Sequence, residues 1–263
     1  MNIWDTFIIT PMVNALLVIY NYIGSFGIAI ILFTILIRLV THPLMVKQIK
    51  SAQAMQSLTQ DKRYKDMQEK YKGQKEKLAQ AQMELYKEMG VSPFASCLPT
   101  LIQLPIIIGL YQSLTRAMAS TPAEMLYLKQ HIYAGFLNVS TLIPLDNHFL
   151  WMDLAKPERL ILPGIAFGIP VMAVIVVITS YMQTKLTMPP ADPTNQNAMM
   201  TNMMNIYMPL LMGYLAYTLS SGLALYFVVS NIIGILQYAM LGKVNWKNLL
   251  PGQKTAAPVK KGR

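Results

Sequence analysis

The chain has 263 residues, of which 54% are hydrophobic and only 13% are charged, and its mean hydropathy is positive. This composition excludes an ordinary soluble domain and predicts a membrane protein that crosses the bilayer several times. The net charge of +10 would suggest a nucleic-acid partner for a soluble protein, but in a membrane protein it must be assigned to one side of the bilayer. The single cysteine, Cys97, excludes an internal disulfide and indicates no metal site, and no cofactor is expected.

The first 25 residues mix aromatic, polar and aliphatic side chains. They have neither the basic start and cleavage site of a secretory signal nor a lipid-acceptor cysteine. We expect 1–25 to form an external helix lying in the membrane interface, with a short additional span as the alternative. The first firm span is expected at 26–43, with its helix ending near His42, because Pro43 is tolerated best at a helix start.

One permanent charge interrupts this first span. Arg38 lies well inside it, and a guanidinium stays protonated near neutral pH. Placing such a charge at mid-bilayer costs roughly 3 kcal/mol on insertion scales and more for an isolated helix. Arg38 must therefore meet a partner from another span, water in a cavity, or a charge that arrives from outside the protein.

Composition changes sharply after Pro43. Residues 44–90 are rich in Lys, Gln and Glu, with ten basic and six acidic side chains, and apolar residues recur at helical spacing. Gly73 interrupts the pattern near its middle. We expect two amphipathic helices that form a hairpin in the cytoplasm.

Four further spans are expected within 91–241, at about 96–114, 160–182, 206–219 and 223–241, and none of them contains an acidic residue. The third should start near Pro163 and be interrupted at Pro170, and the last two should be joined by a tight turn. The tail, 242–263, has six basic residues and no acidic one, and its composition predicts disorder. Five spans put 17 Lys and Arg on one side and four on the other, so the positive-inside rule predicts an external N-terminus and a cytoplasmic C-terminus.

Three local patterns stand in the first, second and last spans. They are Thr34-x-x-x-Arg38 followed by Pro43-Leu44; Cys97-x-Pro99-x-Leu101-Ile102-Gln103-x-Pro105-Ile106; and Ser221-Gly222-Leu223-x-Leu225-Tyr226 leading to Ser230-Asn231 and Gln237. In this order, with the charged hairpin between the first two, they resemble the YidC/Oxa/Alb family of membrane protein insertases in its bacterial form. The resemblance covers almost the whole chain, without the large external domain of some relatives.

The resemblance implies an all-α polytopic fold whose five transmembrane helices form a groove. This groove would be open to the cytoplasm and to lipid but closed to the outside. Arg38 would lie in it, and Thr34 and Phe227 would face a passing client helix. Relatives often have tyrosine or tryptophan at the position of Phe227, so only the apolar contact is carried over to this chain. The other candidate substrate-binding residues are Tyr226, Gln183 and Gln103, and for the two glutamines ordinary hydrogen bonding between helices is the alternative.

The function implied is that of an insertase or chaperone, not an enzyme, in the bacterial cell membrane. A hydrated cation in the groove would attract acidic residues in the translocated tail of a client, and the client's apolar span would then leave sideways into lipid. The expected partners are nascent membrane proteins, the lipid bilayer, the ribosome through the basic tail and hairpin, and the Sec translocon, with no small-molecule substrate. The sequence has no phosphate-binding loop of the G-x-x-x-x-G-K-[ST] type, so ATP is not implied.

Several alternatives stay open at this point. Arg38 could be a structural charge held by backbone carbonyls or by Gln103 and Gln112. The whole chain could be a small multi-span transporter or ion pathway, or a binding scaffold without insertase activity, although transporters usually carry acidic or His residues in their spans. Asp153 and Glu158 are interpreted as surface carboxylates.

Overall fold

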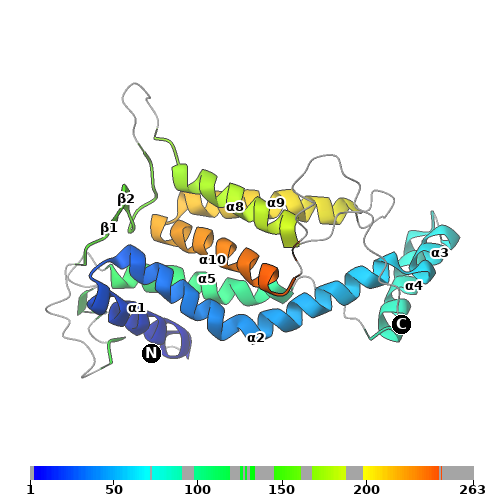
Figure 1. Cartoon of the computed structure of the whole chain (residues 1–263), viewed down its shortest axis with the longest axis horizontal. Helices are drawn as coiled ribbons and strands as arrows, with labels where there is room; N and C mark the ends of the chain where they lie inside the picture. Colours follow the sequence, from blue (N-terminus) through cyan, green and yellow to red (C-terminus); the bar gives the residue numbers. More distant parts are fainter. Residues whose placement is uncertain are drawn as a thin grey trace. The chain divides into compact units, whose positions relative to one another are not determined.

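A computed structural model of the chain describes residues 3–71, 73–90, 98–118, 125–126, 128, 131–133, 145–160, 168–187, 198–242 and 244. The chain divides into two compact units. The first unit comprises Met1–Arg38 and Gly109–Arg263, and the second comprises Leu39–Ile108. Helices dominate the described residues of both (Figure 1).

The first unit contains most of the apolar helices. A π-helical turn, η1 (Asp5–Ile9), leads into α1 (Thr10–Ile23), and the unit also holds the start of α2 (Phe26–Gln60) and the end of α5 (Leu98–Ala117). Its last three helices, α8 (Val171–Thr187), α9 (Ala198–Thr218) and α10 (Ser221–Met240), lie side by side (Figure 1).

The expected end of the first helix at His42 is wrong, because α2 continues through Pro43 as one helix as far as Gln60. Proline removes one backbone donor and strains the preceding turn, which disfavours but does not forbid a helix interior. The residues that follow Pro43 are mostly Met, Lys, Gln, Ala and Leu, which are good helix formers, so the helix resumes directly.

The third apolar segment also differs from expectation. The helix predicted over 160–182 instead begins at Val171 and ends at Thr187. Leu160 and Ile169 exchange two backbone hydrogen bonds of 2.9 Å each, so both belong to an antiparallel bridge rather than to a helix. Pro170 then precedes the first helical residue, a place where its fixed φ and missing donor suit a helix start. The proline therefore begins α8 and does not interrupt it.

The last two helices match the expected pair. α9 starts at Ala198, earlier than the predicted 206, and α10 occupies nearly the predicted range of 223–241. Only Leu219 and Ser220 separate them, so the predicted tight connection is confirmed. One departure from an all-α fold is a two-stranded antiparallel sheet in which β1 (His148–Phe149) pairs with β2 (Met152–Asp153).

The second unit contains the charged segment. It includes α3 (Lys62–Lys70) and α4 (Lys75–Glu88), which lie on either side of Gly73, but α2 also extends into it, so the segment holds three helical pieces and not the two expected. Gly73 has φ +87°, a left-handed conformation that side chains other than glycine rarely adopt. Asp61 separates α3 from α2, because its side chain accepts a hydrogen bond of 2.9 Å from the Arg63 N–H at the start of α3.

A small apolar core holds these charged helices together. It consists of Leu58, Tyr64, Leu85 and Tyr86, with Met67 packed against it. Gln82 donates a hydrogen bond of 3.2 Å to the Tyr64 hydroxyl. The second unit is therefore folded and not merely a solvated run of charge.

Three helices in the described part of the chain are long and apolar enough to cross a membrane: Asp5–Ile23, Phe26–Ser51 and Ser221–Met240. The apolar helix Val171–Thr187 is shorter. By length and composition alone, the N-terminal helix could therefore span the bilayer, and its contacts must distinguish a span from an interfacial helix.

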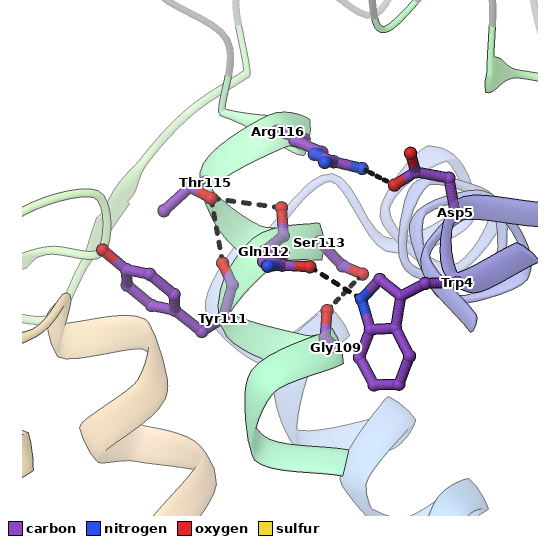
Figure 2. Close-up of polar contacts among 8 residues, drawn as sticks. All are labelled: Trp4, Asp5, Gly109, Tyr111, Gln112, Ser113, Thr115 and Arg116. Atoms are coloured by element: carbon purple, nitrogen blue, oxygen red, sulfur yellow. Dashed lines mark hydrogen bonds and ion pairs between the residues drawn. The ribbon is translucent and has the colours of Figure 1, made fainter. Parts of the chain in front are cut away.

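The N-terminal helix is fixed to the last turns of α5. Trp4 donates its indole N–H to the Gln112 side-chain oxygen at 2.9 Å, and Arg116 forms an ion pair with Asp5 at 2.7 Å (Figure 2). Two turns earlier, Gly109 lets the helix approach closely, because a Cβ there would lie 2.7 Å from the Ile8 side chain.

The middle and the other end of the same helix are held by the loop that follows α5. The buried Asn14 donates to the His131 carbonyl at 2.9 Å and accepts from the Tyr133 N–H at 2.9 Å. Tyr20 accepts a hydrogen bond of 3.1 Å from the Asp146 N–H, and its ring meets Phe26, the first residue of α2, edge to face. Both ends of the N-terminal helix therefore contact the region where α5 ends and α2 begins.

Candidate functional site

Arg38 extends from α2 to α10, where it meets a serine. Its Nε donates to the Ser230 hydroxyl oxygen at 3.0 Å, and its Nη2 donates to the same oxygen. Ser230 is buried and Arg38 is half-buried. The main chain of Arg38 is tied to α10 as well, because Gln237 donates its side-chain amide to the Arg38 carbonyl at 3.2 Å. A neutral hydroxyl orients the guanidinium without cancelling its charge.

Gln183 of α8 lies close to this guanidinium. A Cβ added to Gly234 would lie 2.4 Å from the Gln183 Nε2 and 4.0 Å from the Arg38 Nη1. Three helices thus bring Arg38, Gln183 and Ser230 to one place, and the missing side chain at Gly234 leaves the space for the amide. The structure therefore brings together two of the candidate residues predicted from sequence.

Asn231 holds α8 in position against α10. Its side-chain amide donates to the Thr179 hydroxyl at 3.1 Å and to the Ser180 hydroxyl at 2.8 Å, both on α8. Because Ser230 and Asn231 are consecutive, they project about 100° apart around α10 and reach two different neighbours. The sequence pattern contained this pair, but it gave no indication that one residue binds α2 and the other α8.

Three predicted client-contacting residues are buried in this conformation. Thr34 has an exposed fraction of 0% and donates its hydroxyl to the Ile30 carbonyl at 2.7 Å. Tyr226 and Phe227 are exposed by only 1% and 4%, and their rings lie 5.8 Å apart. They therefore pack within the protein here, and contact with a client helix would require the surrounding helices to separate.

The remaining glutamines lie elsewhere. Gln103 is a half-buried residue of α5 that belongs to the second unit. Gln112, considered as an alternative partner of Arg38, accepts the hydrogen bond from Trp4. The alternative in which Gln112 holds the buried charge is therefore not what the structure shows.

Glu158 was expected at the surface, and this prediction is wrong. Only 7% of it is exposed, and its two carboxylate oxygens accept hydrogen bonds of 3.1 Å from the Trp151 indole and from the Met172 N–H. Since twelve residues separate Glu158 from α8, no local capping signal in the sequence could have revealed this contact. Asp153 is closer to expectation: it is half-buried and pairs with Lys156 at 3.1 Å.

The polar groups of this site are the Arg38 guanidinium and the neutral side chains of Gln183 and Ser230. Within the part of the chain that the structure describes, no group of three or more His, Cys, Asp or Glu side chains could hold a metal ion. The sequences of α2, α5, α8, α9 and α10 contain no Asp or Glu. A half-buried cation with neutral polar neighbours, on helices without acidic residues, can attract a carboxylate supplied by another molecule.

The chain is similar to known membrane proteins along most of its length. The sequence model of a family described as 60Kd inner membrane protein matches residues 18–248. The chain is 33% identical over 266 residues to a protein of Halalkalibacterium halodurans named membrane protein insertase YidC 1, a match that covers 99% of this chain and 86% of that protein. It is 36% identical over 225 residues to a protein of the same name from Streptococcus pyogenes, covering 84% of this chain and 68% of the relative.

A solved structure is similar as well. The crystal structure described as an active YidC insertase with the first transmembrane domain resolved shares 26% sequence identity with this chain, at a TM-score of 0.56. The match covers 89% of this chain and 46% of the crystallised one, so the chain spans less than half of that protein. With the family match over most of its length and two relatives above 30% identity, the chain belongs to the YidC/Oxa family of bacterial inner-membrane proteins.

Proposed function

We propose that this protein is a membrane protein insertase that moves transmembrane segments of client proteins from the cytoplasm into the lipid bilayer. The observation that carries the proposal is the placement of Arg38: a permanent cation on an apolar helix, half-buried, hydrogen-bonded to the neutral Ser230 hydroxyl. The names of the relatives favour this function over the transporter alternative.

The cation would act on the client's polar tail. Attraction between a guanidinium and a carboxylate grows as the effective dielectric constant falls, so an acidic residue of the tail gains more from Arg38 at this depth than in bulk water. The attraction would draw the tail part of the way across the bilayer. Transfer of about 20 apolar residues of the client into lipid then supplies the driving force for release.

The neighbours of Arg38 would share in this binding. Gln183 offers both an amide donor and an acceptor beside the guanidinium, while Ser230 keeps the guanidinium oriented. Thr34, Tyr226 and Phe227 would contact the client helix once the bundle opens, with Gln103 as a further polar position. Nascent membrane proteins are the proposed clients, and the ribosome and the Sec translocon are the proposed partners of the basic tail and the charged second unit.

The proposed topology has five spans, an external N-terminus and a cytoplasmic C-terminus. The contacts of the N-terminal helix support its interfacial placement. Asp5 binds Arg116 in the last turn of α5, and Tyr20 binds the loop after α5, so the two ends of a segment about 24 Å long are fixed at the same end of the bundle. These contacts favour a helix that lies along the membrane surface over one that crosses it.

The test is insertion of a single-span client with an acidic external tail into vesicles containing the purified protein. Arg38→Ala should abolish insertion, and Arg38→Lys should keep much of it, because the proposal depends on charge and not on paired hydrogen bonds. A matched client whose tail acids are replaced by Asn and Gln should lose its dependence on Arg38. Full insertion of the acidic client by Arg38→Ala would refute the proposal.

A further inference from the structure

Residues 149–158, which we call the plug, lie at the starts of three helices. They include the tip of the β1–β2 hairpin and the turn after it. Phe149 covers Gly27 at the start of α2 so closely that a Cβ on the glycine would lie 2.1 Å from the ring. Met152 and Leu154 have exposed fractions of 1% and 0%. Met152 and Leu154 are therefore packed among the helices, whereas Leu150 and Trp151 are 75% and 48% exposed.

The plug supplies hydrogen-bond acceptors for the start of α10. The first N–H groups of a helix have no acceptor within the helix. Here Ser221 N–H donates to the Lys156 carbonyl at 2.8 Å, and Gly222 N–H donates to the Leu154 carbonyl at 3.1 Å. The Ser221 hydroxyl also donates to the Asp153 carbonyl at 2.7 Å. Three carbonyls of the plug thus fix the start of α10.

Gly222 allows this close approach. A Cβ there would lie 3.1 Å from the Leu154 oxygen, 3.3 Å from the Ile30 side chain and 3.5 Å from the Leu114 side chain. Ile30 and Leu114 are both completely buried. The plug, α2, α5 and α10 therefore meet around Gly222 with little room for a side chain. Ile30 precedes Arg38 by two turns of α2, so this packed layer lies about 12 Å along the helix from the candidate site.

Glu158 connects the plug to α8. Its Oε2 accepts the N–H of Met172, the second residue of that helix, and its Oε1 accepts the indole N–H of Trp151 in the plug itself. A carboxylate is favoured at a helix N-terminus both as an acceptor of the free N–H groups and by the helix dipole. With both oxygens bound and 7% of the residue exposed, Glu158 ties the plug to its third helix.

We propose that Glu158 is the positioning residue that holds residues 149–158 against the starts of α8 and α10, and that its loss opens this end of the bundle to water. The inference rests on the proposed function only for the orientation that puts this end outside. Closure here would leave the cytoplasm and the lipid as the routes to Arg38. A water path past the plug would instead let the guanidinium be screened from the external side, where its attraction for a client tail would be lost.

The test measures access from outside to a cysteine placed beneath the plug. Ile30→Cys in a Cys97→Ser background, in whole cells, is treated with a membrane-impermeant maleimide. Labelling should be slow in this parent and about tenfold faster with Glu158→Ala, since removing hydrogen bonds to a charged group changes an opening equilibrium by about that factor. Glu158→Gln, which keeps one acceptor oxygen, should fall between the two.

A second variant protects the test against misfolding of Glu158→Ala. Gly222→Val leaves Glu158 intact but places methyl groups against the Leu154 carbonyl, and it should raise external labelling in the same way. Asp146→Ala is the matched control, because this carboxylate lies in the same loop, is exposed and accepts a hydrogen bond from His148. It should label at the parent rate. Leu186→Cys, buried at the far end of α8, reports general loosening when the purified protein is labelled in detergent, and its labelling should not change with the plug variants.

Labelling of Ile30→Cys at the parent rate in both Glu158→Ala and Gly222→Val would overturn the proposal, as would equal acceleration at Leu186→Cys. If Glu158→Ala does not accumulate in the membrane, Glu158→Gln and Gly222→Val decide in its place. The labelling uses no client, so its failure leaves the insertase proposal intact. Full activity of Arg38→Ala would refute the insertase mechanism without altering the labelling.

Discussion

Gln237 donates its side-chain amide to the main-chain carbonyl of Arg38 over 3.2 Å, two turns of α10 away from the serine that binds the Arg38 side chain. Both the backbone and the guanidinium of Arg38 are thus registered against α10. Between these contacts lies Gly234, where Gln183 of α8 enters. The candidate site is therefore a junction of three helices whose geometry depends on small and polar side chains of α10.

The space above Gly234 should be essential to this junction. Gly234→Ala would place a methyl group 2.4 Å from the present position of the Gln183 Nε2, so the amide must move away from Arg38. Because the far end of a flexible side chain can shift at little cost, we expect the fold to persist and insertion of an acidic client to fall about threefold to tenfold, roughly 1 kcal/mol. The measurement is protease protection of the client in vesicles.

A double mutant separates this effect from general damage. Gln183→Ala should reduce insertion by a similar factor, and adding Gly234→Ala to it should reduce insertion no further, because the amide that the methyl displaces is already gone. Additive losses would show that Gly234 acts through something other than Gln183.

Asn231 should hold α8 to α10. Asn231→Leu removes two hydrogen bonds to the Thr179 and Ser180 hydroxyls, and we expect a loss of about 1 kcal/mol of stability, since hydrogen bonds between membrane helices are modest in strength. Thermal unfolding in detergent checks this value. Ser180→Ala, which deletes one of the two acceptors, should cost less, and a larger loss than in Asn231→Leu would contradict the assignment.

The ion pair between Asp5 and Arg116 should anchor the N-terminal helix. Asp5→Arg alone places two cations together, whereas Asp5→Arg combined with Arg116→Asp restores attraction with the signs reversed. We expect the single variant to lose about 1 kcal/mol of stability and the double variant to regain most of it. The loss should shrink in high salt because both side chains are partly exposed. A double variant as unstable as the single one would show that the residues act separately.

The second unit should be sensitive to alkaline pH. Burial, with a smaller contribution from the neighbouring Tyr64, raises the pKa of the Tyr86 phenol above its ordinary value of about 10. A raised pKa means that the folded unit keeps a proton that the unfolded chain releases. The resulting stability is therefore complete below about pH 10 and is lost as pH rises towards the folded pKa. The pH at which the full chain unfolds, followed by tyrosinate absorbance, should be higher in Tyr86→Phe. The exposed Tyr22→Phe serves as the control.

The sequence predicted which segments are helical better than it predicted where they begin. Two prolines show why. Pro43 was expected to end a helix but lies inside α2, while Pro170 was expected to interrupt a helix but precedes α8. The fixed φ of proline is compatible with both positions, and the choice depends on neighbours such as the bridge between Leu160 and Ile169. The spacing of apolar residues along the sequence does not reveal such backbone pairing.

The candidate site was predictable in part for a similar reason. A lone arginine in an apolar segment is visible in any hydropathy pattern, so Arg38 could be found from sequence. Gly234 and Glu158 could not, because one matters for what it leaves empty and the other for a contact with a helix twelve residues further along the chain. Thr34 carried the right motif, but its hydroxyl is used by its own helix.

Ser230 and Asn231 are consecutive in α10. Ser230 binds Arg38 of α2, and Asn231 binds two hydroxyls of α8. A rotation of α10 about its own axis would break the hydrogen bonds of both residues in a single movement. Release of Arg38 and separation of α8 from α10 would then be coupled, because one movement of α10 breaks both sets of hydrogen bonds.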